Sequence, residues 1–159
     1  MALIFRFQIP YLYPMALVRY TIPQNLPEST GNLRSRAILR GNLRLEEKWS
    51  DRHLDLIDID LLWFTVQMTR QLRVSAQARL DEIQLADPDG RIDLILYREN
   101  DLLIVKDLLA EPRQSIRFDF KEFRQEFHSH QNQLWQDLLS HYPNLPEHPD
   151  FDAIARHFR

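Results

Sequence analysis

The chain has 159 residues, of which 44% are hydrophobic and 27% charged, a composition typical of one soluble globular domain with a single core. It has no cysteine, which excludes a disulfide framework, a thiolate metal site and a cysteine nucleophile. The net charge of −3 hides a contrast, because residues 1–44 carry six arginines and one glutamate while residues 45–111 carry eight basic and fifteen acidic side chains. The acidic middle is a candidate surface for a basic partner; the alternative is that its carboxylates are spread over solvated faces.

The apolar segment 1–18 is expected to belong to the mature protein. No basic region precedes it, and Pro10 and Pro14 would interrupt a signal-peptide helix. Together with the absence of cysteine, this favours a cytoplasmic protein.

Strands are predicted where apolar and polar residues alternate along the chain. The first alternating segments are 3–9, 16–22, 37–47 and 53–57, with a loop at 23–32. In the segment 37–47, Gly41 predicts a bulge or a point of close packing.

The central helix is predicted at residues 58–74, DIDLLWFTVQMTRQLRV. Its apolar face follows the i, i+3, i+4, i+7 spacing. This face consists of Leu61, Phe64, Thr65, Met68 and Leu72. Asp58 can cap the helix, and Asp60 would then lie in the first turn. The apolar run is too short to cross a membrane.

After the ambiguous segment 75–85, a meander of three or four antiparallel strands is predicted. The DPDG sequence at 87–90 is typical of a turn, because Pro88 presets φ and Gly90 tolerates a positive φ. Asn100-Asp101 forms the next predicted turn. The strands around these turns are expected at 92–97, 102–108 and 115–120.

A second helix is predicted from Lys121 to about Ser140, followed by a linker at 143–149. Asp150 is expected to cap a short last helix, within about 150–158. The order of elements predicts an α+β fold: an antiparallel sheet with two main helices packed on one face and a short C-terminal helix. We expect one domain over 1–159, with a Pro-rich N-terminal extension at about 1–34.

Few residues are arranged for chemistry. The three glycines are too far apart for a phosphate-binding or dinucleotide loop, and neither an HExxH motif nor a nucleophile elbow is present. Glu126 and His130, at i and i+4, could share a metal ion, with His141 as a third ligand. The alternative is that all three are polar positions on a solvated helix face. No cofactor is expected.

Seven aspartates are the candidates for binding a partner. They are Asp51, Asp55, Asp58, Asp60, Asp87, Asp89 and Asp93. The first four could bind a metal or perform acid–base chemistry, although capping and solvation explain them more simply. The last three surround the DPDG turn, where a calcium loop would need more oxygen ligands.

Nucleic-acid binding has weaker support from the sequence. Four arginines, Arg34, Arg36, Arg40 and Arg44, precede Trp49. The region contains no lysine before residue 48 and no recognisable motif, and the overall balance is acidic.

The segment from about Ser35 to Ser140 resembles small immunity-like proteins of bacterial toxin–immunity systems. ILRGNLRL resembles their leading strand, IDIDLLWFTVQMTRQL their central helix, and GRIDLILYRENDLLIVKD their hairpin. IRFDFKEFRQEFHSHQNQLWQDL resembles the strand that enters their terminal helix. The N-terminal extension and the last helix depart from the pattern. The resemblance implies a cytosolic bacterial protein that masks a toxin domain.

The leading hypothesis is a non-catalytic binding protein that inhibits a partner toxin through the seven aspartates, with Trp49 as an anchor. One alternative is a metal- or small-ligand-dependent enzyme around Glu126, His130 and His141. Another is a structural subunit of a homo-oligomer or larger assembly. Neither a membrane nor nucleic acid is expected as a partner.

Overall fold

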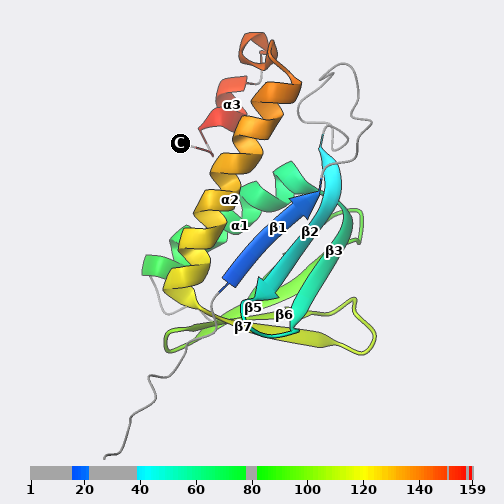
Figure 1. The fold of residues 1–159 in the computed structure, drawn as a ribbon, viewed down its shortest axis with the longest axis vertical. Helices are drawn as coiled ribbons and strands as arrows, with labels where there is room; N and C mark the ends of the chain where they lie inside the picture. The colour runs from blue at the N-terminus through cyan, green and yellow to red at the C-terminus, as the bar shows by residue number, and fades with distance from the viewer. Residues whose placement is uncertain (1–15, 22–38, 78–81, 150, 157, 159) are drawn as a thin grey trace, which may run out of the picture.

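The computed structural model describes residues 16–21, 39–77, 82–149, 151–156 and 158 (Figure 1). The predicted strand at 3–9, the loop at 23–32 and the predicted cap Asp150 lie outside these residues. The described chain forms seven strands and three α-helices, with a short 3-10 helix between the last two α-helices. In chain order the elements are β1 (Ala16–Thr21), β2 (Arg40–Glu47), β3 (His53–Asp60), α1 (Leu61–Gln77), β4 (Ile83–Ala86), β5 (Asp93–Glu99), β6 (Leu102–Asp107), β7 (Gln114–Asp119), α2 (Phe120–His141), η1 (Leu145–Glu147) and α3 (Phe151–Ala155).

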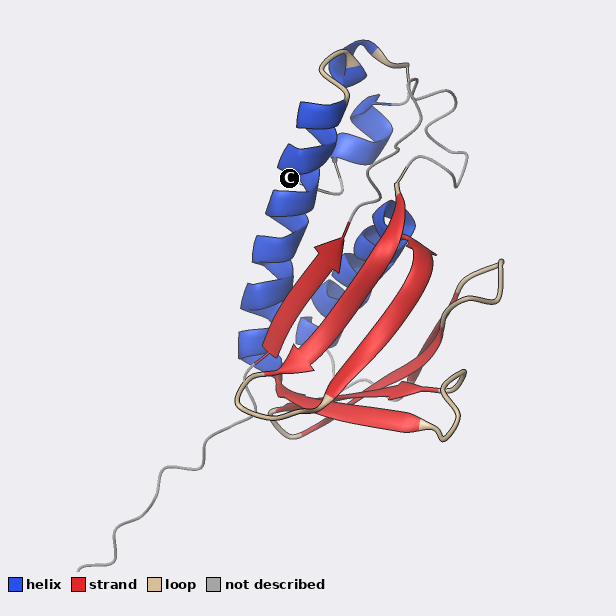
Figure 2. Cartoon of the chain, turned by 45° about the vertical axis from the view of Figure 1, so that its right-hand side comes forward, coloured by secondary structure: helices blue, strands red, loops and turns tan. Residues whose placement is uncertain are grey.

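The seven described strands form two antiparallel sheets, where the sequence had suggested one. The first sheet has the order β1-β2-β3 and the second the order β4-β5-β6-β7. The second sheet is the predicted meander: Leu96 pairs with Val105, which in turn pairs with Ile116. In Figure 2 the long helices lie together along one side of the sheets. Alternation within each strand then buries the side chains that point toward the helices.

Helix α1 is the central helix, and it begins three residues later than predicted. Asp60, rather than Asp58, caps it, because Asp60 Oδ1 accepts a hydrogen bond from the Trp63 backbone N–H at 2.9 Å. Asp58 belongs to β3 and has a left-handed φ of 52°. The five residues of the predicted apolar face are all buried. Each large side chain buried there contributes roughly 1.5–3 kcal/mol before the entropy cost. Through this face α1 packs against β2 and β3 of the first sheet.

Helix α2 covers the edge strand β1 (Figure 1). The Asp119 side chain caps its N-terminus by accepting from the Glu122 backbone N–H at 2.8 Å. Further along, Glu126 Oε1 accepts from the Val18 backbone N–H at 3.5 Å. The Tyr20 hydroxyl donates to the carboxylate of Asp137. Polar groups on one side of α2 thus hold the strand that lies outermost in the first sheet.

The structure confirms both predictions for Gly41, a bulge and a point of close packing. The pairing of β2 with β3 shifts register between Gly41 and Leu43, which is the mark of a bulge. A Cβ atom at Gly41 would lie 2.3 Å from the Thr21 carbonyl oxygen and 2.7 Å from Leu61 Cδ1. Only a residue without a side chain lets β1, β2 and α1 meet this closely.

The α+β class is confirmed, with two main helices and a short C-terminal helix. One continuous cluster of buried apolar side chains joins both sheets to both long helices. Trp135 of α2 stacks on Phe151 and Phe158, with ring centroids 5.6 Å and 4.7 Å apart, and so fixes the C-terminal segment. Among the described residues, no helix combines the length and apolar character needed to cross a membrane.

Candidate functional site

Three of the seven candidate aspartates serve local structure. Asp60 caps α1, as described above. Asp87 Oδ1 accepts from the backbone N–H groups of Arg91 and Ile92 at 2.6 Å and 2.7 Å, which closes the DPDG turn. Asp93 Oδ1 accepts from the Gln84 side-chain amide at 2.7 Å, across the β4–β5 pair. The carboxylates of these three residues stabilise a helix end, a turn and a strand pair.

Two further aspartates, both in β3, form ion pairs with arginines from β2 and from the β4–β5 turn. Asp55 receives two hydrogen bonds from Arg44, at 2.6 Å and 3.0 Å, in the paired geometry that suits a guanidinium and a carboxylate. Asp58 pairs with Arg40 at 3.4 Å and also with Arg91. The second contact links β3 to the β4–β5 turn. Arg91 thus contacts Asp58 through its guanidinium and Asp87 through its backbone N–H.

The remaining candidates, Asp51, Asp89 and Trp49, are exposed in turns. Trp49 lies between β2 and β3, and 90% of its surface is exposed. Its φ of 67° is left-handed. The turn is closed by hydrogen bonds from the Ser50 and Glu47 backbone N–H groups, to Glu47 O at 3.3 Å and to Arg52 O at 3.0 Å. The structure therefore presents the indole on a closed turn.

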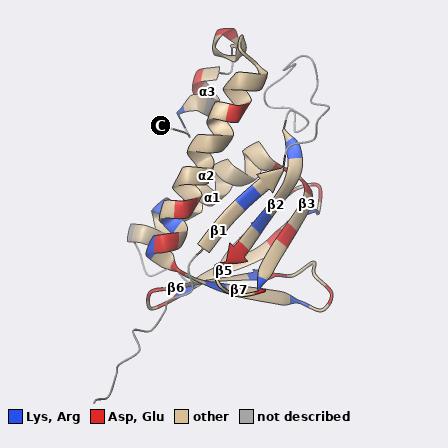
Figure 3. Cartoon of the chain, viewed as in Figure 1, with Lys and Arg blue, Asp and Glu red and all other residues tan. Residues whose placement is uncertain are grey.

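The outer face of the first sheet, which we define by its exposed and partly exposed side chains, continues from this turn. It consists of Leu17, Arg19, Thr21, Asn42, Arg44, Glu46, His53, Asp55 and Ile57. Figure 3 shows charges of both signs on these strands. An open hollow of about 390 Å³ lies on this face, between the Arg19, Arg44 and Asp55 side chains. Ile57, 67% exposed, adds an apolar side chain to it.

The suggested metal ligands are not gathered into a site. Glu126 contacts β1, His130 is buried, and His141 is exposed at the end of α2. His130 Nε2 lies 3.2 Å from Thr65 Oγ1, and its Nδ1 has no hydrogen-bond partner among the described residues. Burial lowers the pKa of His130 to about 4. Within the described part of the chain, no group of three or more histidine and carboxylate side chains could hold a metal ion.

The described arginines considered for nucleic-acid binding also form ion pairs. Arg40 and Arg44 pair with Asp58 and Asp55, while Arg34 and Arg36 lie outside the described residues. These pairs leave less positive charge on β2 for a phosphate backbone.

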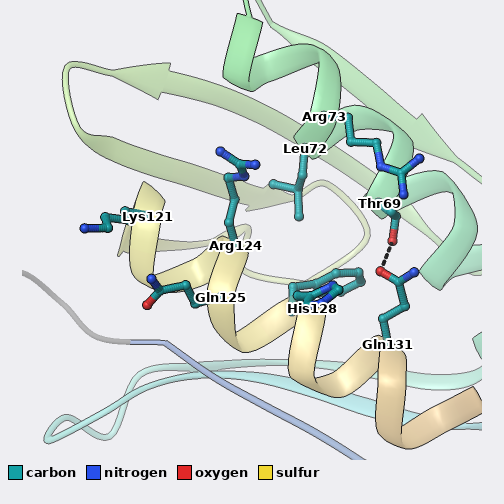
Figure 4. Close-up of a pocket in the computed structure, with 9 residues that line it drawn as sticks. Thr69, Leu72, Arg73, Lys121, Arg124, Gln125, His128 and Gln131 are labelled. Carbon is teal, nitrogen blue, oxygen red and sulfur yellow. Dashed lines mark hydrogen bonds between the residues drawn. The ribbon is translucent and has the colours of Figure 1, made fainter. Parts of the chain in front are cut away.

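Sequence reasoning missed a basic groove between α1 and α2 (Figure 4). Its volume is about 410 Å³. Its lining includes Arg73 from α1 and Lys121, Arg124 and His128 from α2. The spacing of the last three, at i, i+3 and i+7, was visible in the sequence, since it places them on one face of a helix. Nothing in the sequence showed that Arg73, nearly fifty residues earlier, would lie across from them.

Comparison with protein-family models, with curated proteins and with solved structures finds no match for this chain.

Proposed function

We propose that the chain is a non-catalytic binding protein that recognises a basic partner protein through the outer face of the first sheet and the turn bearing Trp49. The observation that carries the proposal is the conformation of Trp49. Bulky residues rarely adopt a positive φ, and holding one there costs of order 1–3 kcal/mol. An exposed indole in a strained turn contributes little to the core, so its value lies in contact with another molecule. Tryptophan is also the residue type most enriched at interface hot spots.

The charge of the neighbouring strands and turns supports a basic partner. Residues 40–60 and 87–93, which form β2, β3 and the β4–β5 turn, carry nine acidic and five basic side chains. Several of these charges pair internally, but an acidic excess remains; part of it lies in the Trp49 turn (Asp51) and part where Asp58, near the far end of β3, contacts the β4–β5 turn. Such an excess steers a basic protein toward the surface and raises the association rate at low salt.

The resemblance to immunity-like proteins suggests which kind of partner this is. On that reading, the partner is a toxin domain encoded by the neighbouring gene, and binding masks the domain in the cytoplasm. The metal-dependent enzyme and the homo-oligomer subunit stay predictions from the sequence. Elemental analysis and light scattering would test them.

The experiment measures binding of the purified chain to the C-terminal domain encoded by the neighbouring gene, by isothermal titration calorimetry. Trp49→Asn is the informative variant, because asparagine tolerates a positive φ and removes the indole. We expect a loss of affinity of about tenfold or more, with stability unchanged or raised. Val74→Ala is the control, since Val74 is an exposed apolar residue on α1.

The charge component has its own test. Asp51→Asn changes an exposed aspartate whose carboxylate makes no ion pair with a described residue. It should lower the association rate, and added salt should have the same effect. A partner that binds Trp49→Asn as tightly as the unchanged chain refutes the proposed surface. A neighbouring gene that encodes no toxin domain refutes the immunity-like version.

A further inference from the structure

We propose that the groove between α1 and α2 binds a small phosphorylated ligand, with Arg73, Lys121 and Arg124 holding its phosphate groups. The inference goes beyond the proposed function, because the groove lies between the helices rather than on the outer face of the first sheet. The two sites can therefore be tested independently.

The helices build the groove from two facing rows of side chains (Figure 4). On α1, Thr69, Leu72 and Arg73 follow the i, i+3, i+4 spacing of one helical face. The facing row on α2 consists of Lys121, Arg124, Gln125 and His128. Because each row belongs to a regular helix, the spacing of the charged residues along the groove is set by rigid backbone.

Among the residues described, the groove is lined by positive charges without negative ones. No carboxylate is among its described lining residues, and Arg73, Lys121 and Arg124 make no ion pair with any described residue. The other described arginines divide into two groups, because Arg52, Arg70, Arg113, Arg117 and Arg156 also make no ion pair with a described residue, while the rest are paired. Arg19, Arg40, Arg44, Arg91 and Arg98 each lie within 4 Å of a carboxylate oxygen. The three cations of the groove are spread along one concavity, with Lys121 and Arg73 at its two ends and Arg124 between them (Figure 4), and an anion between them would offset their mutual repulsion.

Phosphate fits this arrangement better than a single carboxylate. A phosphate group carries up to two negative charges and three acceptor oxygens, and guanidinium groups donate to such oxygens in pairs. Two or more phosphate groups would match the three cations in charge. A volume of about 410 Å³ also lies in the range of small-molecule sites.

The other walls suit the rest of a small organic ligand. Leu72 and Phe127 border the groove from the core, with only 5% and 1% of their surfaces exposed. Gln125 and Gln131 supply amides, and the Gln131 carbonyl oxygen accepts from Thr69 Oγ1 at 3.2 Å, which holds that amide in place. A few fixed polar groups beside apolar walls are the usual composition of a ligand pocket.

The test uses inorganic pyrophosphate as the probe and citrate as the carboxylate comparison. Two-dimensional NMR of the full-length protein would follow the backbone amides of residues 69–73 and 121–131 during each titration. We expect saturable shifts in these segments at submillimolar to millimolar pyrophosphate, and weaker binding of citrate. Higher salt should weaken the pyrophosphate affinity.

Arg124→Gln is expected to weaken the affinity for pyrophosphate about tenfold. Arg117→Gln, an exposed arginine on β7, is the matched control and should leave the affinity unchanged. Thermal unfolding separates a binding role from a structural one. Removing one of three mutually repelling cations should leave stability unchanged or raise it, whereas loss of a structural arginine would lower it.

Three results would overturn the proposal. The first is the absence of saturable shifts at millimolar pyrophosphate. The second is citrate binding as tightly as pyrophosphate, which would remove the preference for phosphate. The third is an equal effect of Arg124→Gln and Arg117→Gln, which would show that the anion responds to overall charge and not to this groove.

Discussion

Lowering the pH from 7 to 5 should destabilise the protein through one buried histidine. Only 4% of His130 is exposed, between α1, α2 and β1. The rings of Tyr20 and Phe127 lie 5.1 Å away, edge-on and tilted. Thr65 faces it from α1 as an uncharged hydrogen-bonding partner. Tyr20 stays protonated, because burial and its bond to Asp137 raise its pKa. We therefore find no anion placed directly against the imidazole among the described contacts.

The direction of the effect follows from proton binding. Burial lowers the pKa of His130 from 6.5 to about 4. Between these two values the unfolded chain binds a proton that the folded chain does not, so stability falls as the pH falls. The contribution is complete above about pH 6.5 and exhausted below about pH 4. At about 1.4 kcal/mol per pKa unit, the whole effect is about 3 kcal/mol. About 2 kcal/mol of it is lost by pH 5.

Urea denaturation at pH 7, 6 and 5 would measure this loss. His130→Gln keeps a hydrogen-bonding group near Thr65 but does not titrate, so its stability should fall by about 2 kcal/mol less than that of the unchanged protein. His128→Gln, an exposed histidine on the same helix, is the control and should follow the unchanged protein. All three proteins carry the same carboxylates, so the difference isolates His130.

An NMR titration of the imidazole gives a second measurement that needs no variant. A pKa near 6.5 for His130 in the folded protein would refute the reasoning, whatever the stability of His130→Gln.

Two other substitutions test how the fold is built, each measured by the free energy of unfolding in urea. Gly41→Ala should cost about 1–3 kcal/mol, because its Cβ would meet the Thr21 carbonyl oxygen; a neutral result would mean that the two strands can separate there. Asp60→Ala should cost about 1 kcal/mol by removing the cap that receives the Trp63 N–H, whereas Asp51→Ala should change stability by less than about 0.5 kcal/mol. Equal costs at the two aspartates would contradict the assignment of the cap.

The local periodicities predicted most of the described elements. Alternating residues marked β1, β2 and the meander from β5 to β7, because one face of each strand is buried. The 3.6-residue spacing marked α1 and α2 for the same reason. The predicted start of α1 was three residues too early. IDID continues the alternation of β3, and both Asp58 and Asp60 are suitable caps, so the sequence did not show where the strand ends. Asp58 is held at its positive φ beside Asn42, whose side chain accepts from the Asp58 backbone N–H at 2.9 Å.

The division into two sheets could not be predicted in this way. Alternation shows which face of a strand is buried, but not which strand lies next to it. The same limit applies to the candidate site. The aspartates were visible as a cluster in the sequence, yet their roles depend on partners such as Arg44 in β2 and Arg91 in the β4–β5 turn. The basic groove depends on the packing of two helices, and sequence spacing reports only one helix at a time.

The bonds between β1 and α2 also bear on how the protein is made. Tyr20 and Asp137 are separated by 117 positions in the chain. A ribosome that adds roughly 5–20 residues per second needs several seconds or more to cover that interval. During that time β1 can pair with β2, but the helix that covers it has not yet been synthesised. Val18 and Tyr20 then remain exposed to water or to a chaperone. Folding of the nascent protein is therefore completed only when α2, the last long helix, has emerged.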